Sequence, residues 1–111
     1  MKLYWYKLEK YRITEEEIEV KETAKLYKTL DGSCFPHEFC STSKKRDEGR
    51  VLCCWREIFV FFTEKNLEKA RDLFVEYQKQ VVTRKEKQIQ ELEAEIEEAE
   101  RQINRLEDME V

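Results

Sequence analysis

The 111-residue chain contains only two glycines and one proline, the residues that most often interrupt regular secondary structure. This scarcity predicts long strands and helices joined by few tight turns. No stretch approaches the 18 consecutive apolar residues of a membrane-spanning helix. Five charged side chains within residues 1–13 also exclude the apolar core of a signal peptide. We therefore expect a soluble, cytoplasmic protein that binds no membrane.

Charge is abundant but unevenly distributed along the chain. Charged residues make up 41% of the sequence, against about 25% in an average globular protein. Residues 1–63 hold 12 basic and 11 acidic side chains, whereas residues 86–111 hold 3 basic and 10 acidic ones, a net charge of −7. Such an acidic segment opposes attraction to nucleic acid or to anionic lipid. The distribution favours a protein partner.

The first half of the chain predicts β-structure. Residues 3–13 are rich in aromatic side chains and partly alternate, which favours a strand. Residues 18–30 place most of their apolar side chains on one face, as a strand with one buried face requires. The polar run 14–17 predicts the break between these two strands. Residues 51–62 are apolar on both faces, typical of a central strand, and residues 31–50 predict a long loop. We expect a small three-stranded antiparallel sheet.

One long helix is predicted from about Glu64 to Met109, because neither glycine nor proline occurs in this part. Thr63 is its expected N-cap. An apolar stripe at spacings of three and four residues can cover the sheet, formed by Leu67, Ala70, Phe74, Tyr77 and Val81. The predicted fold class is thus α+β. A globular domain over residues 1–81 precedes an acidic coiled-coil helix over residues 82–111.

From Val82 the apolar stripe narrows, and from Ile89 its residues follow one another at spacings of three and four, the a and d positions of a coiled coil. A helix of about 46 residues is about 69 Å long, whereas a globule of 80 residues is about 25 Å across. The distal stripe should therefore extend beyond the core of its own domain and need a partner. The residues expected at this oligomer interface are Val82, Ile89, Leu92, Ile96, Ala99, Ile103 and Leu106.

The positions beside this stripe are acidic. Two parallel copies would set Glu95 against the partner's Glu100, at a cost of a few tenths of a kcal/mol per contact that the apolar stripe can override. β-branched residues at a and Leu at d favour a parallel dimer, and antiparallel pairing stays open. A partner with a basic surface would gain from the same charges. Candidate residues for binding it are Glu93, Glu95, Glu97 and Glu100.

Cysteine and histidine cluster in the predicted loop. Cys34, His37 and Cys40 are spaced C-x2-H-x2-C, and Cys53 and Cys54 follow on the next strand. Zinc binds four nitrogen or sulfur ligands in a tetrahedron. The spacing departs from paired C-x2-C knuckles, and neighbouring strand residues point to opposite faces, so only one of the last two could join. Free thiols without a cofactor are the simpler interpretation, with zinc as the alternative.

Catalysis finds little support in the sequence. His37 is the only histidine, and no nucleophile, phosphate-binding or metalloprotease motif surrounds it. The many carboxylates have the regular spacing of a solvated helix face. We expect no catalytic residues and no enzyme activity.

Nucleic-acid binding is a further hypothesis. Lys44, Lys45 and Arg46 form a basic segment near Trp55, and the first strand carries further aromatic side chains such as Trp5. Aromatic residues on a sheet with nearby cations can stack single-stranded bases. The net charge of −4 and the lack of a ribonucleoprotein sequence pattern argue against this function.

The segments YWYKLEKYRI, IEVKETAKLYKTL and FVFFTEKNLEKARDLF resemble small accessory proteins of bacteriophages and mobile elements. Such proteins often bind and block a host machine, including defence nucleases. The resemblance implies an inhibitor whose clustered carboxylates imitate a nucleic-acid backbone on a basic target. It supplies no motif from which site residues can be transferred.

The leading hypothesis is a non-enzymatic interaction module that homodimerises through its distal helix. The predicted central strand is apolar on both faces, while the sequence offers one helix to cover them. A dimer would bury the second face as well, through Tyr4, Tyr6, Trp55 and Phe59. The acidic inhibitor is the alternative to this hypothesis.

Overall fold

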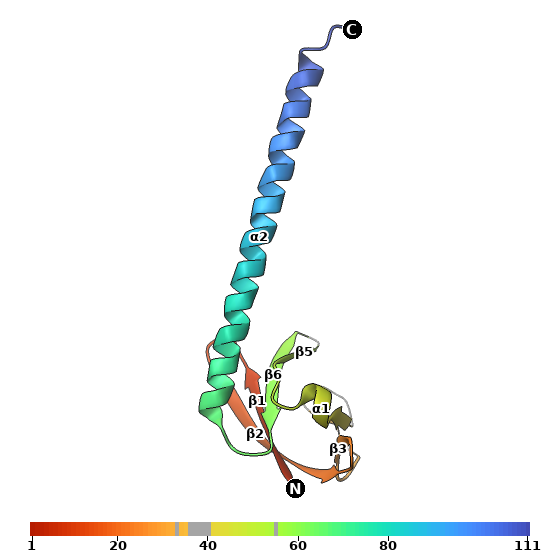
Figure 1. The fold of residues 1–111 in the computed structure, drawn as a ribbon, viewed down its shortest axis with the longest axis vertical. Helices are drawn as coiled ribbons and strands as arrows, with labels where there is room; N and C mark the ends of the chain where they lie inside the picture. The colour runs from red at the N-terminus through yellow and green to blue at the C-terminus, as the bar shows by residue number, and fades with distance from the viewer. Residues whose placement is uncertain (33, 36–40, 55) are drawn as a thin grey trace. The chain divides into compact units, whose positions relative to one another are not determined.

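A computed structural model describes residues 1–32, 34–35, 41–54 and 56–111 of the chain. The chain divides into two compact units, Met1–Tyr77 and Gln78–Val111. The predicted α+β class is confirmed, because an antiparallel sheet is combined with one long C-terminal helix (Figure 1). The prediction of three strands is wrong, since the curled sheet has six strands within the described residues.

The strands lie in the order β4-β3-β2-β1-β6-β5, and each neighbouring pair is antiparallel. The apolar strands β1 and β6 are therefore adjacent at the centre of the sheet, although far apart in sequence. In chain order the elements are β1 (Lys2–Leu8), β2 (Ile13–Glu22), β3 (Leu26–Thr29), β4 (Ser41–Ser43), α1 (Lys44–Asp47), β5 (Leu52–Cys54), β6 (Glu57–Phe62) and α2 (Leu67–Glu107).

The first hairpin turns earlier than the sequence predicted. Glu9 donates its backbone N–H to the carbonyl of Arg12 at 2.8 Å, which closes the turn after β1. The polar run 14–17, predicted as the break, instead lies inside β2. In the described chain β3 pairs only with the last three residues of β2, so the glutamates occupy an exposed edge where charge is favoured. Lys2 offsets one of them, Glu17, at 3.4 Å.

The other predicted strands are each divided in two. Residues 18–30 are interrupted by a turn in which the Thr23 N–H donates to the carbonyl of Leu26 at 2.9 Å. Residues 51–62 form β5 and β6, and Arg56 between them has a positive φ of 68°, a conformation typical of two-residue hairpins. Both strands of this hairpin are apolar, so hydrophobicity alone did not reveal the turn. The predicted loop 31–50 contains β4 and α1.

One face of the sheet buries a stack of aromatic rings. The indole of Trp5 lies 5.4 Å from the ring of Phe35, 4.9 Å from Phe59 and 5.0 Å from Phe61, measured between centroids. Tyr27 of β3 meets the Phe61 ring edge-on at 6.2 Å. Because the sheet curls, β3 contributes to the same core as β1 and β6. This face is therefore covered within the single chain.

The start of α2 covers the other face. Ala70 and Phe74 are 0% and 2% exposed, and they pack with Tyr6, Val60 and Phe62 of the sheet. The prediction that five residues of α2 cover the sheet is therefore correct for Ala70 and Phe74 but wrong at the ends of the stripe. Of its other members, Leu67 is 50% exposed, and Tyr77 and Val81 are only half-buried.

Both sheet faces are buried without a second copy of the chain. Tyr6 and Phe59, expected to become buried in a dimer, are 0% and 2% exposed in the single chain. The expectation of a bare second sheet face that a dimer could bury is therefore wrong. It assumed a flat three-stranded sheet, whereas six strands curl around their own aromatic core.

Asn66, and not Thr63, caps the N-terminus of α2. The Asn66 side-chain oxygen Oδ1 accepts the backbone N–H of Lys69 at 3.0 Å, which satisfies one of the free donors of the first turn. The Asn66 N–H in turn donates to the Tyr6 hydroxyl at 2.9 Å. This second bond connects the start of the helix to the central strand β1.

We predict that Asn66→Ala lowers the free energy of unfolding by about 1 kcal/mol, the usual loss on removing an asparagine N-cap. Thr63→Ala is the control and should change it by less than about 0.5 kcal/mol, because Thr63 is exposed. Urea denaturation at one fixed protein concentration measures both. A larger loss from Thr63→Ala than from Asn66→Ala would contradict the assignment.

Candidate interaction surface

Helix α2 continues from the first unit into the second without a break. Its sequence is dominated by Glu, Gln, Lys, Arg, Ala and Leu, the residues of highest helix propensity, and it contains no glycine or proline. Residues 67–77 belong to the first unit and residues 78–107 to the second. The whole predicted distal interface therefore lies on a single regular helix.

An exposed apolar stripe follows this distal part, and we call it the seam. Its six large side chains are 51–66% exposed in the single chain, and its one alanine is exposed as well. A repeated row of exposed Ile and Leu is uncommon on a protein that stays monomeric. All seven predicted interface residues contribute to the seam, which comprises Val82, Ile89, Leu92, Ile96, Ala99, Ile103 and Leu106.

The acidic side chains near the seam fall into two groups. Arg101 forms ion pairs with Glu97 at 3.6 Å and Glu98 at 3.0 Å, and these three residues occupy the outer heptad positions b, c and f. Glu97 was predicted to bind a partner, but its position is away from the seam. The glutamates at positions e and g do flank the seam, and all are exposed: Glu86, Glu93, Glu95, Glu100 and Glu107.

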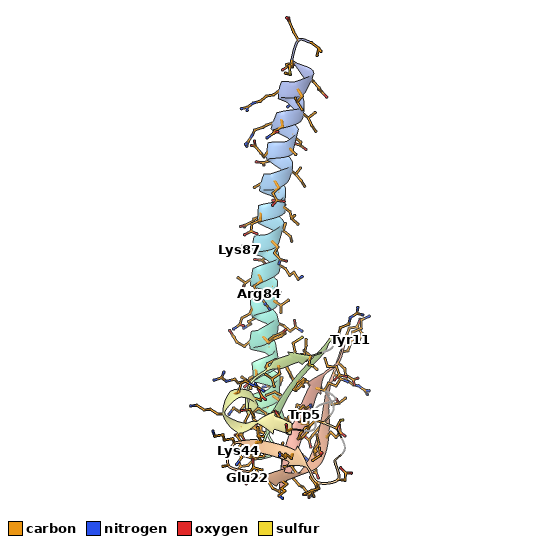
Figure 2. The ribbon with its side chains drawn as sticks, turned by 90° about the vertical axis from the view of Figure 1, so that its right-hand side faces the viewer. Trp5, Tyr11, Glu22, Lys44, Arg84 and Lys87 are labelled. Atoms are coloured by element: carbon orange, nitrogen blue, oxygen red, sulfur yellow. The ribbon has the colours of Figure 1, made fainter. Side chains whose placement is uncertain are left out.

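The predicted basic segment forms the short helix α1, and two of its three cations are neutralised locally. Lys44 pairs with Glu22 of β2 (Figure 2), and its ammonium lies 5.2 Å from the ring centroid of Tyr27. Arg46 pairs with Asp47 at 2.8 Å. Lys45 is exposed. Local pairing of this kind reduces the positive field available to a nucleic acid.

Two aromatic residues of β1 are core residues, and a third, Tyr4, is partly buried. Trp5 is 2% exposed and Tyr6 is 0% exposed, so neither ring has a free face on which a base could stack. Tyr11 is 88% exposed, but it lies in the turn after β1 (Figure 2). Trp55, the other predicted contact residue, lies outside the described residues.

The candidate zinc ligands are only partly described by the structure. Cys34 and Cys53 are exposed, and Cys54 packs partly against the Trp5 side of the core. His37 and Cys40 lie outside the described residues. Among the residues that are described, no three metal-ligating side chains are brought together.

Sequence reasoning missed a buried carboxylate that organises α1. Asp47 is 7% exposed and accepts hydrogen bonds from the Thr42 hydroxyl at 2.8 Å and the Ser43 backbone N–H at 3.0 Å. Burial by itself raises the pKa of Asp47, but hydrogen bonds from Arg46, Ser43 and Thr42 outweigh it and hold the pKa below its usual value. Asp47 lies four residues after the N-cap Ser43, one position beyond the acidic site of a capping box, so this sequence signal was absent.

Tyr27 connects α1 to β3. Its hydroxyl donates to Glu48 at 3.1 Å. Burial, followed by this bond to a carboxylate, raises the pKa of Tyr27 to about 12. The basic segment therefore serves the architecture of the first unit, which leaves the seam of α2 as the candidate functional surface.

No protein-family model, curated protein or solved structure matches the chain. Within the described residues, no helix combines the length and the apolar composition needed to cross a bilayer.

We predict that Asp47→Asn lowers the free energy of unfolding at pH 7 by about 1–3 kcal/mol, because hydrogen bonds to a charged acceptor are lost. The lowered pKa of Asp47 stabilises the fold fully at pH values above the ordinary Asp pKa of about 4. That stabilisation is lost as the pH falls through the lower pKa of the folded protein. The difference between wild type and variant should thus shrink in acid. Asp108→Asn, an exposed control, should have little effect, and a pH-independent loss for Asp47→Asn would contradict the argument.

Proposed function

We propose that this protein is a non-enzymatic protein–protein interaction module that homodimerises through the seam of α2. The observation that carries the proposal is the row of six large apolar side chains, each at least half exposed, at the a and d spacing of a coiled coil. Burying the exposed half of one such side chain contributes about 1 kcal/mol, since complete burial contributes about 1.5–3 kcal/mol. A paired helix would bury all of them together.

The pattern of the seam favours two parallel, in-register helices. Ile89, Ile96 and Ile103 occupy successive a positions. Leu92 and Leu106 occupy two of the four d positions, and Lys85 and Ala99 occupy the other two. β-branched residues at a with Leu at d favour two-stranded parallel coiled coils. Residues 82–106 span about three and a half heptads. A helix of this length is only marginally stable alone in water, so packing against a second helix would supply most of its stability.

The acidic residues beside the seam support a second candidate function. The five flanking glutamates would attract a basic target, which fits the resemblance to phage accessory proteins that block a host machine in the cytoplasm. Direct nucleic-acid binding is less well supported, because Trp5 and Tyr6 are buried and Lys44 and Arg46 are already paired.

We predict a dimer mass for the wild-type protein in light scattering at micromolar concentration, and a monomer mass for Ile96→Asp. A carboxylate at an a position would be buried without a partner, which is strongly unfavourable. Ala94→Asp is the matched control, because it adds the same charge at the outer position f and should remain dimeric.

Circular dichroism of all three proteins shows whether α2 is still helical. A monomeric wild type with a helical α2 would contradict homodimerisation. Equal disruption by Ala94→Asp and Ile96→Asp would contradict the assignment of the interface to the seam.

A further inference from the structure

The charges of the distal helix are segregated by sign around the seam. Five of the seven e and g positions hold glutamate and the other two hold glutamine; they are Glu86, Gln88, Glu93, Glu95, Glu100, Gln102 and Glu107. The basic side chains of the same stretch occupy positions c, d and f instead; they are Arg84, Lys85, Lys87, Arg101 and Arg105 (Figure 2 marks Arg84 and Lys87). The surface beside the seam is therefore acidic on both sides.

A second copy of the chain places no cation at the flanking e and g positions in either orientation. Parallel pairing sets position g against e and brings Glu95 to the partner's Glu100. Antiparallel pairing sets e against e and g against g, again without a cation. The homodimer therefore gains mainly from its apolar residues, with Lys85 at a d position as the cation nearest the flanks, and the flanking glutamates oppose it.

The flanking glutamates are also free of internal ion pairs. Residues 78–111 are all described, and within them the ion pairs of Arg101 are with Glu97 and Glu98 on the outer positions, while none involves the five flanking glutamates. All five are exposed. A cationic partner would therefore gain new ion pairs without breaking existing ones.

We infer that the preferred occupant of the seam is a helix of another protein, with its own Ile/Leu stripe and with Lys or Arg at the flanking e and g positions. This inference rests on the proposed function, because both use the seam as the binding surface. It adds that the homodimer is the weaker state, which such a basic helix replaces. Apolar packing supplies affinity for either occupant, and the flanking charges select between them.

Two synthetic peptides of residues 82–107 test the inference against the full-length chain. In the first, the five flanking glutamates are replaced by lysine. In the second, the seven non-basic residues at b, c and f are replaced by lysine, which leaves the flanks acidic and gives the same net charge of +7. Fluorescence anisotropy of labelled peptide measures Kd, and light scattering measures the mass of the complex.

The flank-lysine peptide should bind at least about tenfold more tightly than the matched peptide, because five ion pairs of a few tenths of a kcal/mol each act only at the flanks. It should convert the dimer to a one-to-one complex, and its binding should weaken with salt. Self-association of the chain should instead strengthen with salt, because screening reduces repulsion.

Two full-length triple variants locate the effect on the protein itself. Glu93→Lys/Glu95→Lys/Glu100→Lys should no longer bind the flank-lysine peptide, whereas Glu91→Lys/Glu97→Lys/Glu98→Lys should still bind it, although both variants change the net charge equally.

Equal binding of the two peptides, or failure to displace the second copy, would overturn the inference and leave homodimerisation standing. A monomeric chain that still selects the flank-lysine peptide would support the inference and overturn homodimerisation. A monomeric chain that binds neither peptide would overturn both.

Discussion

The antiparallel pairing of β1 with β6 is the constraint on which the rest of the first unit depends. It sets Trp5 opposite Phe61 and Tyr6 opposite Val60, although these partners are more than 50 residues apart in sequence. Side chains alternate across a strand, so this register sends Trp5 and Phe61 to one core and Tyr6 and Val60 to the other. A shift of one residue would exchange the two sets and place each on the wrong face.

The position of α2 follows from the same pairing. Val60 and Phe62 point to the face where Ala70 and Phe74 pack, and the Tyr6 hydroxyl accepts the N–H of Asn66 just before the helix begins. Tertiary contacts thus determine where the helix starts. Beyond Tyr77 the stability of α2 depends on its local helix propensity and on packing of the seam against a partner.

Two properties of the distal helix bear on the proposed function, the apolar spacing of the seam and the acidic residues that flank it. The apolar spacing of the seam supports the proposal that another helix packs there, because Ile and Leu gain by leaving water. The acidic flanks bear on which helix that is, because charge contributes specificity more than affinity. We therefore propose that the same surface serves a weak homodimer and a stronger complex with a basic helix. The basic segment of α1 contributes to the first unit, since Lys44 pairs with Glu22 and Arg46 pairs with Asp47.

The sequence by itself determined the α+β class, the long helix and the membership of the seam, because each depends on the spacing of neighbouring residues. The helix interior from Leu67 to Glu107 could be predicted from propensity and from the absence of glycine and proline. The candidate surface could be predicted for the same reason, since the heptad pattern is local. The heptad pattern did not determine which helix packs on the seam, because an apolar stripe can pack against any helix that carries a complementary apolar stripe.

Only the tertiary structure decided the number of strands, the N-cap and the burial of the aromatic residues. The turns at Thr23 and Arg56 interrupt runs whose hydrophobicity looks continuous, and Asn66 caps α2 where it meets the Tyr6 hydroxyl. Trp5 is a core residue, because a curled six-stranded sheet brings rings from distant segments around it. These features depend on contacts between residues far apart in the chain, and the periodicity of a short window carries no information about such contacts.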